Sequence, residues 1–426
     1  MNDSPRFSAA WLMRGGALAL TLTVALFAPY LWWLGGLGLG AAWLARRWAV
    51  GRWWTRTPFD WPLWLLTLVG TSSYLVAVYL TGEWVNALGR WLVFCLGLTL
   101  YADIVTLQST EATVLRLWRL FAWGGAALAI LGVLGGALPD KLPVLGEVAQ
   151  RMPQLLSGWP GAVEGFHPNQ VAGTLLWFLP APWALWAMRR RGKDSADSLP
   201  AALLLIPPCL LMLAGFSLTQ SRIALLGALV ASLSLLVFYG RRGRLLMAAI
   251  FGAALIGGLL IGPARLNALI TSQFIQETTG VFDPGWRQRV WVAAIQATGD
   301  FPYTGLGLGL FRRLGPQFYH FPILPADVGH AHNIWLHTGA EMGLPGLVVH
   351  LALWGMTAAQ TLTAGRSGQP RRPLLMAAWW SLVAFTVFGL TDAVALGAKT
   401  SLAWWMYLGL VALTAKPASG DGHARG

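Results

Sequence analysis

The chain has 426 residues, of which 56% are hydrophobic and only 11% are charged, and its formal net charge is +13. This composition excludes an ordinary soluble protein and is typical of a membrane protein. Apolar runs recur along nearly the whole length, so we expect one integral membrane domain over residues 1–426. Cys95 and Cys209 fall inside apolar runs and are expected to be small buried hydrophobes, with no disulfide framework or metal cluster.

Twelve apolar runs are long enough to cross a bilayer whose hydrocarbon core is about 30 Å thick. They cover residues 10–29, 31–45, 60–80, 87–107, 119–138, 168–188, 200–219, 222–239, 245–262, 334–360, 373–393 and 400–415. The first run continues without a small-residue cleavage site, so we expect a membrane helix there and no removed signal peptide. The sequence therefore predicts an all-α polytopic membrane protein with about twelve transmembrane helices.

Basic residues mark the orientation of these helices, because cytoplasmic loops are enriched in Lys and Arg. If both termini are cytoplasmic, all the basic clusters of the alternate loops lie inside. These clusters fall at residues 46–56, 116–119, 189–193, 241–244 and 366–372. The charge of +13 is then mainly a topology signal, and we expect no nucleic-acid partner.

The same orientation places two sizeable segments outside the cytoplasm, a smaller one at residues 139–168 and a large one at residues 263–333, between the ninth and tenth spans. Basic residues in the large segment break the positive-inside trend. They are Arg265, Arg287, Arg289, Arg312 and Arg313. Since they do not serve topology, we expect some of them to hold an anionic ligand.

Four of the seven histidines, His320, His330, His332 and His337, lie between residues 318 and 347. His332-Asn333 is followed after nine residues by Gly343-x-x-Gly346, and Gly343 and Pro345 disfavour a straight helix. We expect a short helix over residues 334–342, bent against the span that follows. His332 would then lie at the helix start and face an aqueous cavity.

His337 and Glu341 are four residues apart and would share a helix face, where Glu341 could orient the imidazole. Any single histidine here could equally be an interfacial side chain satisfied by backbone or water. A zinc site built from His330, His332 and His337 is a weaker interpretation, because the set has no cysteine and no His-Glu-x-x-His pattern. General-base catalysis suits the ordinary pKa of imidazole, about 6.5, better.

Thr219-Gln220-Ser221-Arg222 falls at the outer junction of two apolar runs. Arg222 could snorkel to the interface, and Ser221 could cap the next helix. The functional alternative is that the planar guanidinium of Arg222 binds two phosphate oxygens. In Phe166-His167-Pro168-Asn169-Gln170, the Pro and Asn are ordinary helix-start residues, while His167 could also support the site.

The spacing of apolar residues from Val290 to Ala297 predicts a helix along the membrane surface, with Arg287 near its start. Arg287 and Arg289 would lie about 200° apart, so one of the two can face the site. The glycine-rich run at residues 301–309 lacks the Gly-Lys-Ser/Thr ending of a nucleotide-binding loop. We expect it to form tight backbone turns beside a substrate.

These patterns, in this order, resemble the O-antigen ligase and polymerase superfamily of bacterial envelope proteins. The resemblance covers residues 165–350 and rests on Ser221-Arg222, on Arg287-x-x-x-Trp291 before Phe301-Pro302-Tyr303-Thr304-Gly305-Leu306-Gly307, and on His330-Ala331-His332-Asn333 with Glu341, Gly343 and Gly346. The distance from His332-Asn333 to Gly343 is similar to the ligase signature, and polymerases carry related histidine motifs.

The resemblance implies a GT-C-like fold in the bacterial inner membrane, with the active site on the periplasmic face. It implies transfer of O-antigen glycan from undecaprenyl pyrophosphate to a sugar hydroxyl of the lipid A core, without nucleotide sugar, metal or other cofactor. His332 would be the base, with His337 or His330 as alternatives, and Arg222 with Arg287 would stabilise the departing pyrophosphate. His330, Asn333, Glu341, Arg289, Arg265 and His167 are the expected substrate-binding or orienting residues.

Three alternatives stay open at this point. A polymerase or a protein O-oligosaccharyltransferase of the same superfamily would use similar residues. A transporter is the alternative from another class, and the scarcity of charged residues within the spans argues against it. The sequence leaves undecided which of His332 and His337 takes the proton and which of Arg287 and Arg289 faces the site.

Overall fold

The computed structural model describes residues 5–82, 84–136, 138–156, 158, 166–190, 203–262, 265, 286–319, 329–366 and 369–416. These residues form helices and connecting loops, and their one β-type pairing is an isolated bridge between Gly136 and Phe166. His320, on which one of our expectations falls, lies outside the described residues.

The described residues are mostly helical, and many of the helices are long and apolar. Their bounds are α1 Pro5–Phe27, α2 Trp32–Val50, α3 Asp60–Thr81, α4 Trp84–Thr106, α5 Glu111–Gly135, α6 Pro143–Arg151, α7 Pro168–Phe178, α8 Ala181–Arg189, α10 Ile206–Leu218, α11 Arg222–Ser234, α12 Gly240–Ile261, α14 Trp286–Asp300, α15 Phe311–Tyr319, α16 Ile334–Arg366, α17 Arg372–Gly389 and α18 Leu402–Thr414. Short 3₁₀ turns flank some of them, η1 at Pro29–Leu31, η3 at Leu235–Phe238 and η4 at Lys399–Ser401.

Where the structure describes them, the twelve expected runs fall mostly on helix. Seven helical segments are long and apolar enough to cross a membrane, and three shorter apolar helices accompany them in the described part of the chain. The protein is therefore all-helical and has the character of a polytopic membrane protein. The exact count of twelve spans stays a prediction.

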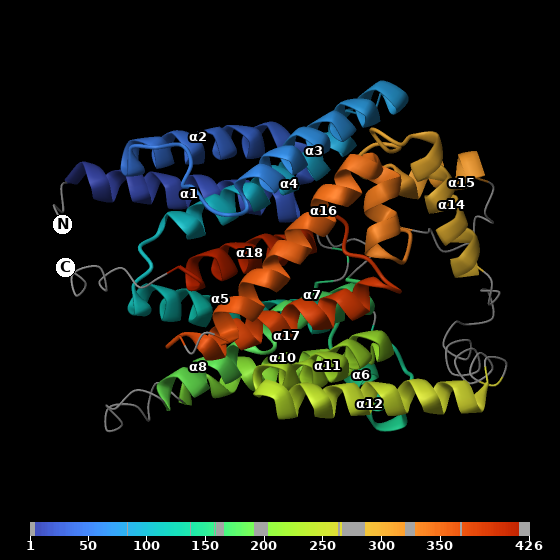
Figure 1. Ribbon diagram of the computed structural model, residues 1–426. Helices are drawn as coiled ribbons and strands as arrows, with labels where there is room; N and C mark the ends of the chain where they lie inside the picture. The colour runs from blue at the N-terminus through green and yellow to red at the C-terminus, as the bar shows by residue number, and fades with distance from the viewer. Residues whose placement is uncertain are drawn as a thin grey trace.

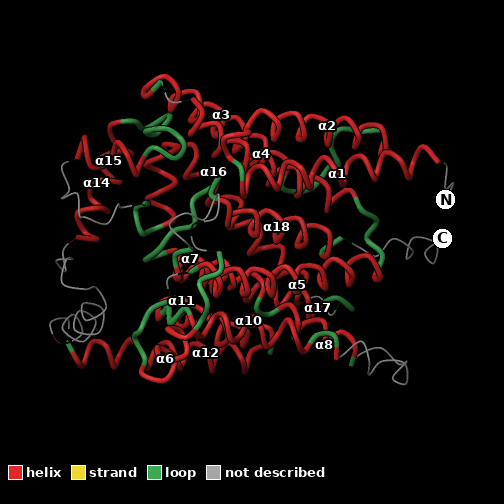
Figure 2. The backbone as a smooth tube through the Cα atoms, turned by 180° about the vertical axis from the view of Figure 1, so that it is seen from behind, coloured by secondary structure: helices red, strands yellow, loops and turns green. Residues whose placement is uncertain are grey.

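The long helices run side by side, with α1 to α4 along one flank, α16 and α18 in the middle and α8 with α10 to α12 along the other flank (Figure 1). The view from behind shows the same order (Figure 2). We call the end of the bundle that carries α14 and α15 the outer end, and the end where α1 begins and α18 ends the inner end (Figure 1).

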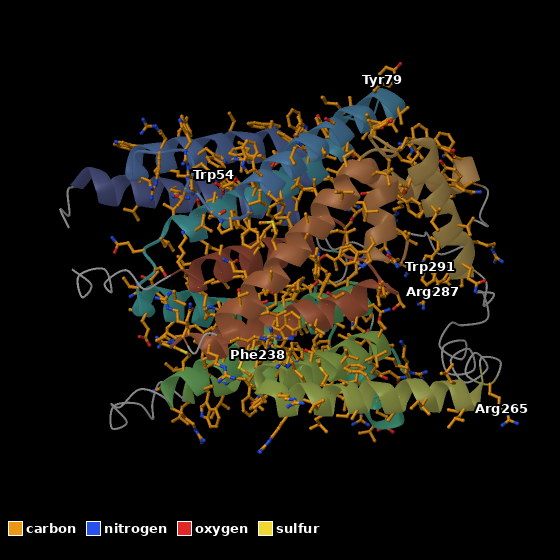
Figure 3. The ribbon with its side chains drawn as sticks, in the orientation of Figure 1. Trp54, Tyr79, Phe238, Arg265, Arg287 and Trp291 are labelled. Carbon is orange, nitrogen blue, oxygen red and sulfur yellow. The ribbon has the colours of Figure 1, made fainter. Side chains whose placement is uncertain are left out.

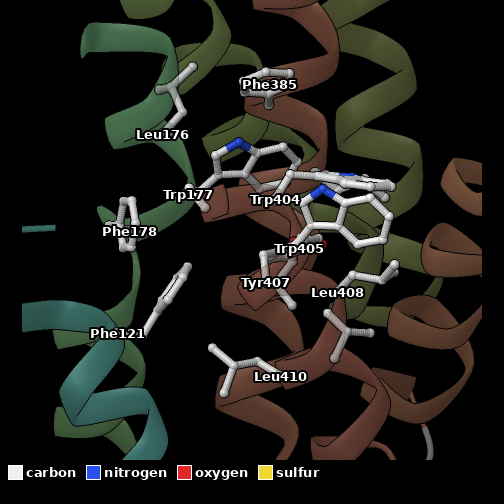
Figure 4. Close-up of a cluster of buried hydrophobic side chains, with 14 of the residues drawn as sticks. Phe121, Leu176, Trp177, Phe178, Phe385, Trp404, Trp405, Tyr407, Leu408 and Leu410 are labelled. Atoms are coloured by element: carbon white, nitrogen blue, oxygen red, sulfur yellow. The ribbon is translucent and has the colours of Figure 1, made fainter. Parts of the chain in front are cut away.

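The centre of the bundle is an aromatic core in which rings from different helices meet. Trp177 on α7 lies 4.5 Å from Phe385 on α17 and 4.5 Å from Tyr407 on α18, measured between ring centroids (Figure 4). Helices approach closely where glycine removes the side chain: a Cβ on Gly97 of α4 would overlap the indole of Trp405. Small residues at such crossings allow tight packing without a hydrophobic driving force, as is usual in membrane proteins.

Helix α16 carries the bend that the sequence predicted. Gly343 has a φ of +68°, a left-handed conformation that costs glycine little, and the helix restarts beyond it. The amide of Leu344 donates to the carbonyl of Pro302 at 2.7 Å, and a Cβ on Gly343 would lie 2.6 Å from that same oxygen. The bend therefore brings the glycine-rich loop against the first turns of α16.

The inner end contains a buried charge cluster that the sequence did not predict. Arg46, expected in a cytoplasmic loop, is fully buried in α2 and donates to Asp103 of α4 at 3.0 Å. Arg14 of α1, 1% exposed, donates to the same carboxylate at 3.0 Å. Two guanidinium groups therefore share one carboxylate and join α1, α2 and α4.

Candidate functional site

A cavity of about 750 Å³ opens at the outer end, where α1 ends and α2, α4 and α7 begin. Its polar wall holds both the histidine segment before α16 and the loop that follows α17. The polar residues named in this wall are Arg90, His167, Gln170, Arg312, His330, His332, Lys399 and Thr400. The cavity therefore gathers side chains that lie more than 300 residues apart in the sequence.

His330 and His332 form a cluster with Asp392, a buried carboxylate from the loop after α17. Nε2 of His330 lies 3.3 Å from Oδ1 of Asp392, and Nδ1 of His332 lies 3.9 Å from the same oxygen. The two imidazole rings are 4.2 Å apart between centroids. Asp392 is 1% exposed, so its charge acts in a medium that screens it weakly.

The hydrogen bonds distinguish the roles of these two histidines. The backbone N–H of His332 donates to Nδ1 of His330 at 3.2 Å, so the proton of a neutral His330 is on Nε2 and points at Asp392. Both ring nitrogens of His330 are then engaged. His332, which also reaches the cavity wall, keeps a ring nitrogen available for a substrate proton.

His332 sits in a strained backbone conformation that its surroundings hold in place. Its φ is +48°, a region that a side chain other than glycine rarely adopts. Trp291 donates its indole N–H to the carbonyl of His332 at 3.3 Å, and Trp286 meets the imidazole edge-on at 4.9 Å between centroids. Strain of this kind is found mostly where a side chain must be aimed at a functional site.

Burial keeps both histidines neutral near pH 7. It lowers the pKa of His330 to about 4, against the opposing effect of Asp392. It also lowers the pKa of His332 well below its usual value, with further lowering from His330 and Arg287. A neutral imidazole is the form that accepts a proton, so both are deprotonated at the pH where a base would work.

The two arginines of helix α14 differ in their recorded interactions with the histidine cluster. The charge of Arg287 reaches His332, and its guanidinium lies 5.5 Å from the ring of Trp286, which itself touches His332. Figure 3 shows Arg287 and Trp291 together on α14. Both Arg287 and Arg289 are half-buried, and neither is among the residues that line the cavity. The structure thus brings Arg287 to the histidine cluster, as the Arg-x-x-x-Trp spacing indicates.

His337 and Glu341 lie behind the cavity wall. They are 3% and 4% exposed, and Nε2 of His337 is 3.5 Å from Oε2 of Glu341. Glu341 also accepts from the amide of Phe311 at 3.4 Å, while its own carbonyl accepts from Gly307 at 3.2 Å. The expected pair is present, and Glu341 holds the glycine-rich loop through these hydrogen bonds.

The glycine-rich loop makes the tight turns expected of it. Gly305, Gly307 and Gly309 have φ values of +65°, +111° and +79°. The amide of Leu306 donates to the carbonyl of Ala340 at 2.8 Å, which fastens the loop to α16. The loop is therefore a structural clamp across the first turns of α16.

Asn333 caps α16. Its Oδ1 accepts from the amides of Trp335 and Leu336 at 3.0 and 3.1 Å. Its Nδ2 donates to the carbonyl of Leu390 at 3.0 Å. A single side chain thus starts the helix after His332 and ties it to the loop that carries Asp392.

The remaining expected residues divide into those that reach the cavity and those that do not. His167 lines it, and its charge is felt by both His330 and His332. Arg222 is half-buried at the start of α11 and is not on the wall. Arg265 is exposed beyond α12, apart from Arg287 (Figure 3).

Gln220, next to Arg222, shows what that junction does structurally. It has a φ of +48°, and its side-chain Oε1 accepts from the amides of Lys141 and Leu142 at 2.9 and 2.7 Å. The turn before α11 therefore anchors the segment that precedes α6. The sequence did not suggest this contact between the smaller outer segment and the bundle.

Three residues of the site were missed from the sequence: Asp392, Arg90 and Lys399. Arg90 and Lys399 each lie at the outer end of an apolar run, so the departure from the positive-inside trend that pointed to Arg287 applies to them as well. Asp392 ends a long apolar run, where an acidic residue is unexpected. A stricter search for charges at outer run ends would have found all three.

His330, His332 and Asp392 are also the described residues whose ligand atoms could hold a metal ion, since these atoms lie within 4.8 Å of one another. Asp392 takes the third position that the sequence assigned to His337. Zinc accepts such a set of nitrogen and oxygen ligands. A metal-bound imidazole is a poor base, so the metal site and a His332 base exclude each other.

Apolar spanning helices and a cavity with histidines, arginines and a buried carboxylate at one end define an all-helical membrane protein with the equipment of an enzyme. Residues 207–351 match the family model described as O-antigen ligase, and this match supports that family for the chain. Its members are glycosyltransferase-like enzymes. No curated protein matches the chain.

The matched segment contains Arg222, Arg287, His330, His332 and Glu341. His167, Arg90, Asp392 and Lys399 lie outside it and join the site through the fold.

Proposed function

We propose that the protein is an O-antigen ligase that transfers glycan from undecaprenyl pyrophosphate to a sugar hydroxyl of the lipid A core, in the bacterial inner membrane and on its periplasmic face. The observation that carries the proposal is His332: it is neutral, lines a cationic cavity and lies beside a buried aspartate. The outer end would face the periplasm, in keeping with the basic clusters in the opposite loops.

In the proposed reaction the acceptor hydroxyl loses its proton to His332 as its oxygen attacks the anomeric carbon. The new bond from that oxygen to the anomeric carbon forms while the bond from the carbon to the phosphate oxygen breaks, and its electron pair leaves on the phosphate. Attack opposite the leaving group inverts the anomeric centre. The imidazolium that forms is stabilised by the charge of Asp392, whose Oδ1 lies 3.9 Å from Nδ1 of His332.

The donor's own sugar pyrophosphate bond supplies the driving force, so the reaction needs neither ATP nor a nucleotide sugar. Arg287 stands next to His332 and can stabilise charge that develops on the leaving phosphate. Arg222 keeps the role we expect from the family pattern, a second contact to the phosphate. Arg289 and Arg265 stay candidate contacts to the polymer of the donor.

The test is reconstitution of the purified protein with a lipid-linked glycan and lipid A core. Wild type should form the capped product, and His332→Ala should lower the rate by roughly 10²- to 10⁴-fold while the protein folds normally. His350→Ala is a control, because His350 is buried in α16 among aromatic rings and is not on the cavity wall. Full transfer by His332→Ala would overturn its role as base.

A deletion strain separates this proposal from its relatives. Loss of a ligase removes all O-antigen from the core, whereas loss of a polymerase leaves single repeat units attached. If the core stays fully capped and a glycosylated protein disappears instead, the acceptor is a protein.

A further inference from the structure

Two buried polar atoms of the histidine cluster have no hydrogen-bond partner in the described part of the chain. They are Oδ2 of Asp392 and Nδ1 of His332. Asp392 is 1% exposed, and its other oxygen, Oδ1, accepts from the amide of Ala393 at 2.8 Å. A buried carboxylate oxygen that receives no hydrogen bond is costly, and a bound cation removes that cost.

The three potential ligand atoms of the cluster are spaced nearly as a tetrahedral metal ion requires. Ligand atoms around zinc lie about 3.3 Å apart, because each is about 2.0–2.1 Å from the metal. Nε2 of His330 is 3.3 Å from Oδ1 of Asp392, and Nδ1 of His332 is 3.9 Å from the same oxygen. All three atoms lie within 4.8 Å of one another. Small rotations of the two rings therefore complete one face of a tetrahedron.

The surroundings of the cluster meet the other requirements of a metal site. His330 and His332 line the cavity, which gives an ion a path to the cluster and leaves a fourth coordination position open. The amide of Ala393 supports the carboxylate, as outer-shell groups usually do. The side chain of Asn333 joins the histidine segment to the loop of Asp392, so the ligands are held together from both sides.

Charges around the cluster oppose a permanently held ion. One carboxylate compensates a divalent cation only in part, and the positive charges of Arg287 and Arg90 reach His332 and His330. To bind through Nε2, a neutral His330 must carry its proton on Nδ1, which removes the hydrogen bond that Nδ1 accepts from the amide of His332. These costs favour reversible binding of the metal.

We propose that His330, His332 and Asp392 form an inhibitory zinc site, in which a reversibly bound ion prevents His332 from acting as the base. The inference rests on the proposed function, because it concerns the same imidazole. Zinc takes the lone pair of Nδ1, so the ring proton of a neutral His332 must be on Nε2. Neither nitrogen can then accept the proton of an acceptor hydroxyl, and transfer stops until the ion leaves.

The first experiment measures metal binding without any transfer. Zinc is titrated calorimetrically into the full-length protein in detergent, with any histidine tag removed, and cobalt, which absorbs visible light in tetrahedral sites, is a second probe. His330→Ala, His332→Ala and Asp392→Asn should each weaken binding of both ions by roughly 100-fold, because each removes a ligand. His350→Ala is the matched control, since His350 is buried on α16 and is not in the group. A thermal melt of every variant checks that it folds.

A change of charge beside the cluster gives a result that unspecific metal binding would not. Arg287→Gln removes a positive charge that reaches His332 and should tighten zinc binding by roughly three- to tenfold. Arg151→Gln removes the same charge from an exposed side chain of α6, where water and salt screen it, and should leave zinc binding unchanged.

The second experiment adds zinc to the reconstituted transfer assay. Zinc should stop the reaction, and EDTA should then restore the full rate. Magnesium is the control ion, because it also binds diphosphate but takes oxygen ligands and not imidazole. It should leave the rate unchanged, which separates occupation of the site from removal of the donor by the metal.

Equal zinc binding by wild type and the three ligand variants overturns the inference, and so does undiminished transfer by a protein saturated with zinc. If zinc binds as expected but no glycan reaches lipid A core with or without EDTA, the metal site stands and the proposed function fails. If transfer occurs and zinc neither binds nor inhibits, the proposed function stands and the inference fails.

Discussion

A cluster of charged residues lies near each end of helix α4, buried at the inner end and half-buried at the outer end. At the inner end Arg14 and Arg46 enclose Asp103, and both guanidiniums are almost fully buried. At the outer end, roughly 20 Å along the helix, Arg90 faces a cavity together with Arg312 and Lys399.

The inner cluster matches two arginines to one carboxylate and adds hydrogen bonds to neighbouring backbone and hydroxyl groups. Arg46, for example, also donates to the carbonyl of Trp53 at 3.1 Å. At the outer end, the carboxylate of Asp392 lies next to His330, and the three cations line the cavity. Buried charges can serve structure alone, as at the inner end, whereas charged side chains that line a cavity are candidates for ligand binding.

The largest effect should come from breaking the inner cluster. Asp103→Asn leaves two buried guanidiniums without their carboxylate and should lower the free energy of unfolding by about 3–5 kcal/mol. Thermal unfolding in detergent measures it. Glu147→Gln is the control, because Glu147 and Arg151 form an exposed pair 3.8 Å apart that should contribute little. An unchanged melting temperature for Asp103→Asn would show that its ion pairs with Arg14 and Arg46 do not stabilise the fold.

The outer cluster should respond in rate and much less in stability. Asp392→Asn should lower transfer by about 100-fold, because the carboxylate orients His330 and stabilises a protonated His332. Single-turnover rates measure the change, and the pH profile should move as well, since Asp392 raises the pKa of His330. Asp300→Asn is the control at an exposed position on α14, and equal losses in the two variants would contradict the role.

A smaller effect is expected from a residue that only holds the backbone of His332 in place. Trp291→Phe removes the indole N–H that holds the carbonyl of His332, a hydrogen bond worth about 1 kcal/mol. The transfer rate should fall by about fivefold. Trp183→Phe, at a side chain that is 65% exposed, should leave the rate unchanged.

The transfer rate should depend little on pH in the range where free histidines titrate. Because burial lowers the pKa of both His330 and His332, they stay neutral below pH 6.5, and transfer at pH 5.5 should remain within about twofold of its value at pH 7.5. Stability moves the other way on acidification. The unfolded chain binds protons near pH 6.5 and the folded chain does not, so stability falls as the pH drops below that value. Loss of activity centred at pH 6.5 would show that the histidines are not desolvated.

Chelation should have the smallest effect. If His332 is the base, EDTA should leave transfer unchanged, because a base cannot at the same time be a metal ligand. Inactivation by EDTA and recovery with zinc would instead assign His330, His332 and Asp392 to a metal site.

Local patterns in the sequence predicted much of the fold and part of the site. The apolar runs fall mostly on helices in the described residues, and Gly343 with Pro345 marked the bend in α16. The sequence also showed that Arg287 and Arg289 lie on different faces of one helix, because helix periodicity fixes which side chains share a face.

What the sequence could not predict depends on contacts between distant segments. Asp392 meets His330 across 62 residues, as the two numbers show, and nothing local to either residue indicates the contact. Arg46 was read as a topology signal because its cluster of basic residues lies next to a span, and only the position of Asp103 shows that it is buried. The place of Arg222 off the cavity wall likewise depends on how α11 packs.

Asn333 holds together the two segments that carry His332 and Asp392. By capping α16 and donating to the carbonyl of Leu390, it joins the backbone next to His332 to the loop that carries Asp392. In the proposed reaction His332 and Asp392 would thus be preorganised, and little reorganisation energy would be needed when an acceptor docks. Acceptors that differ in their sugar can then be served by one fixed pair, with selection left to the walls around it.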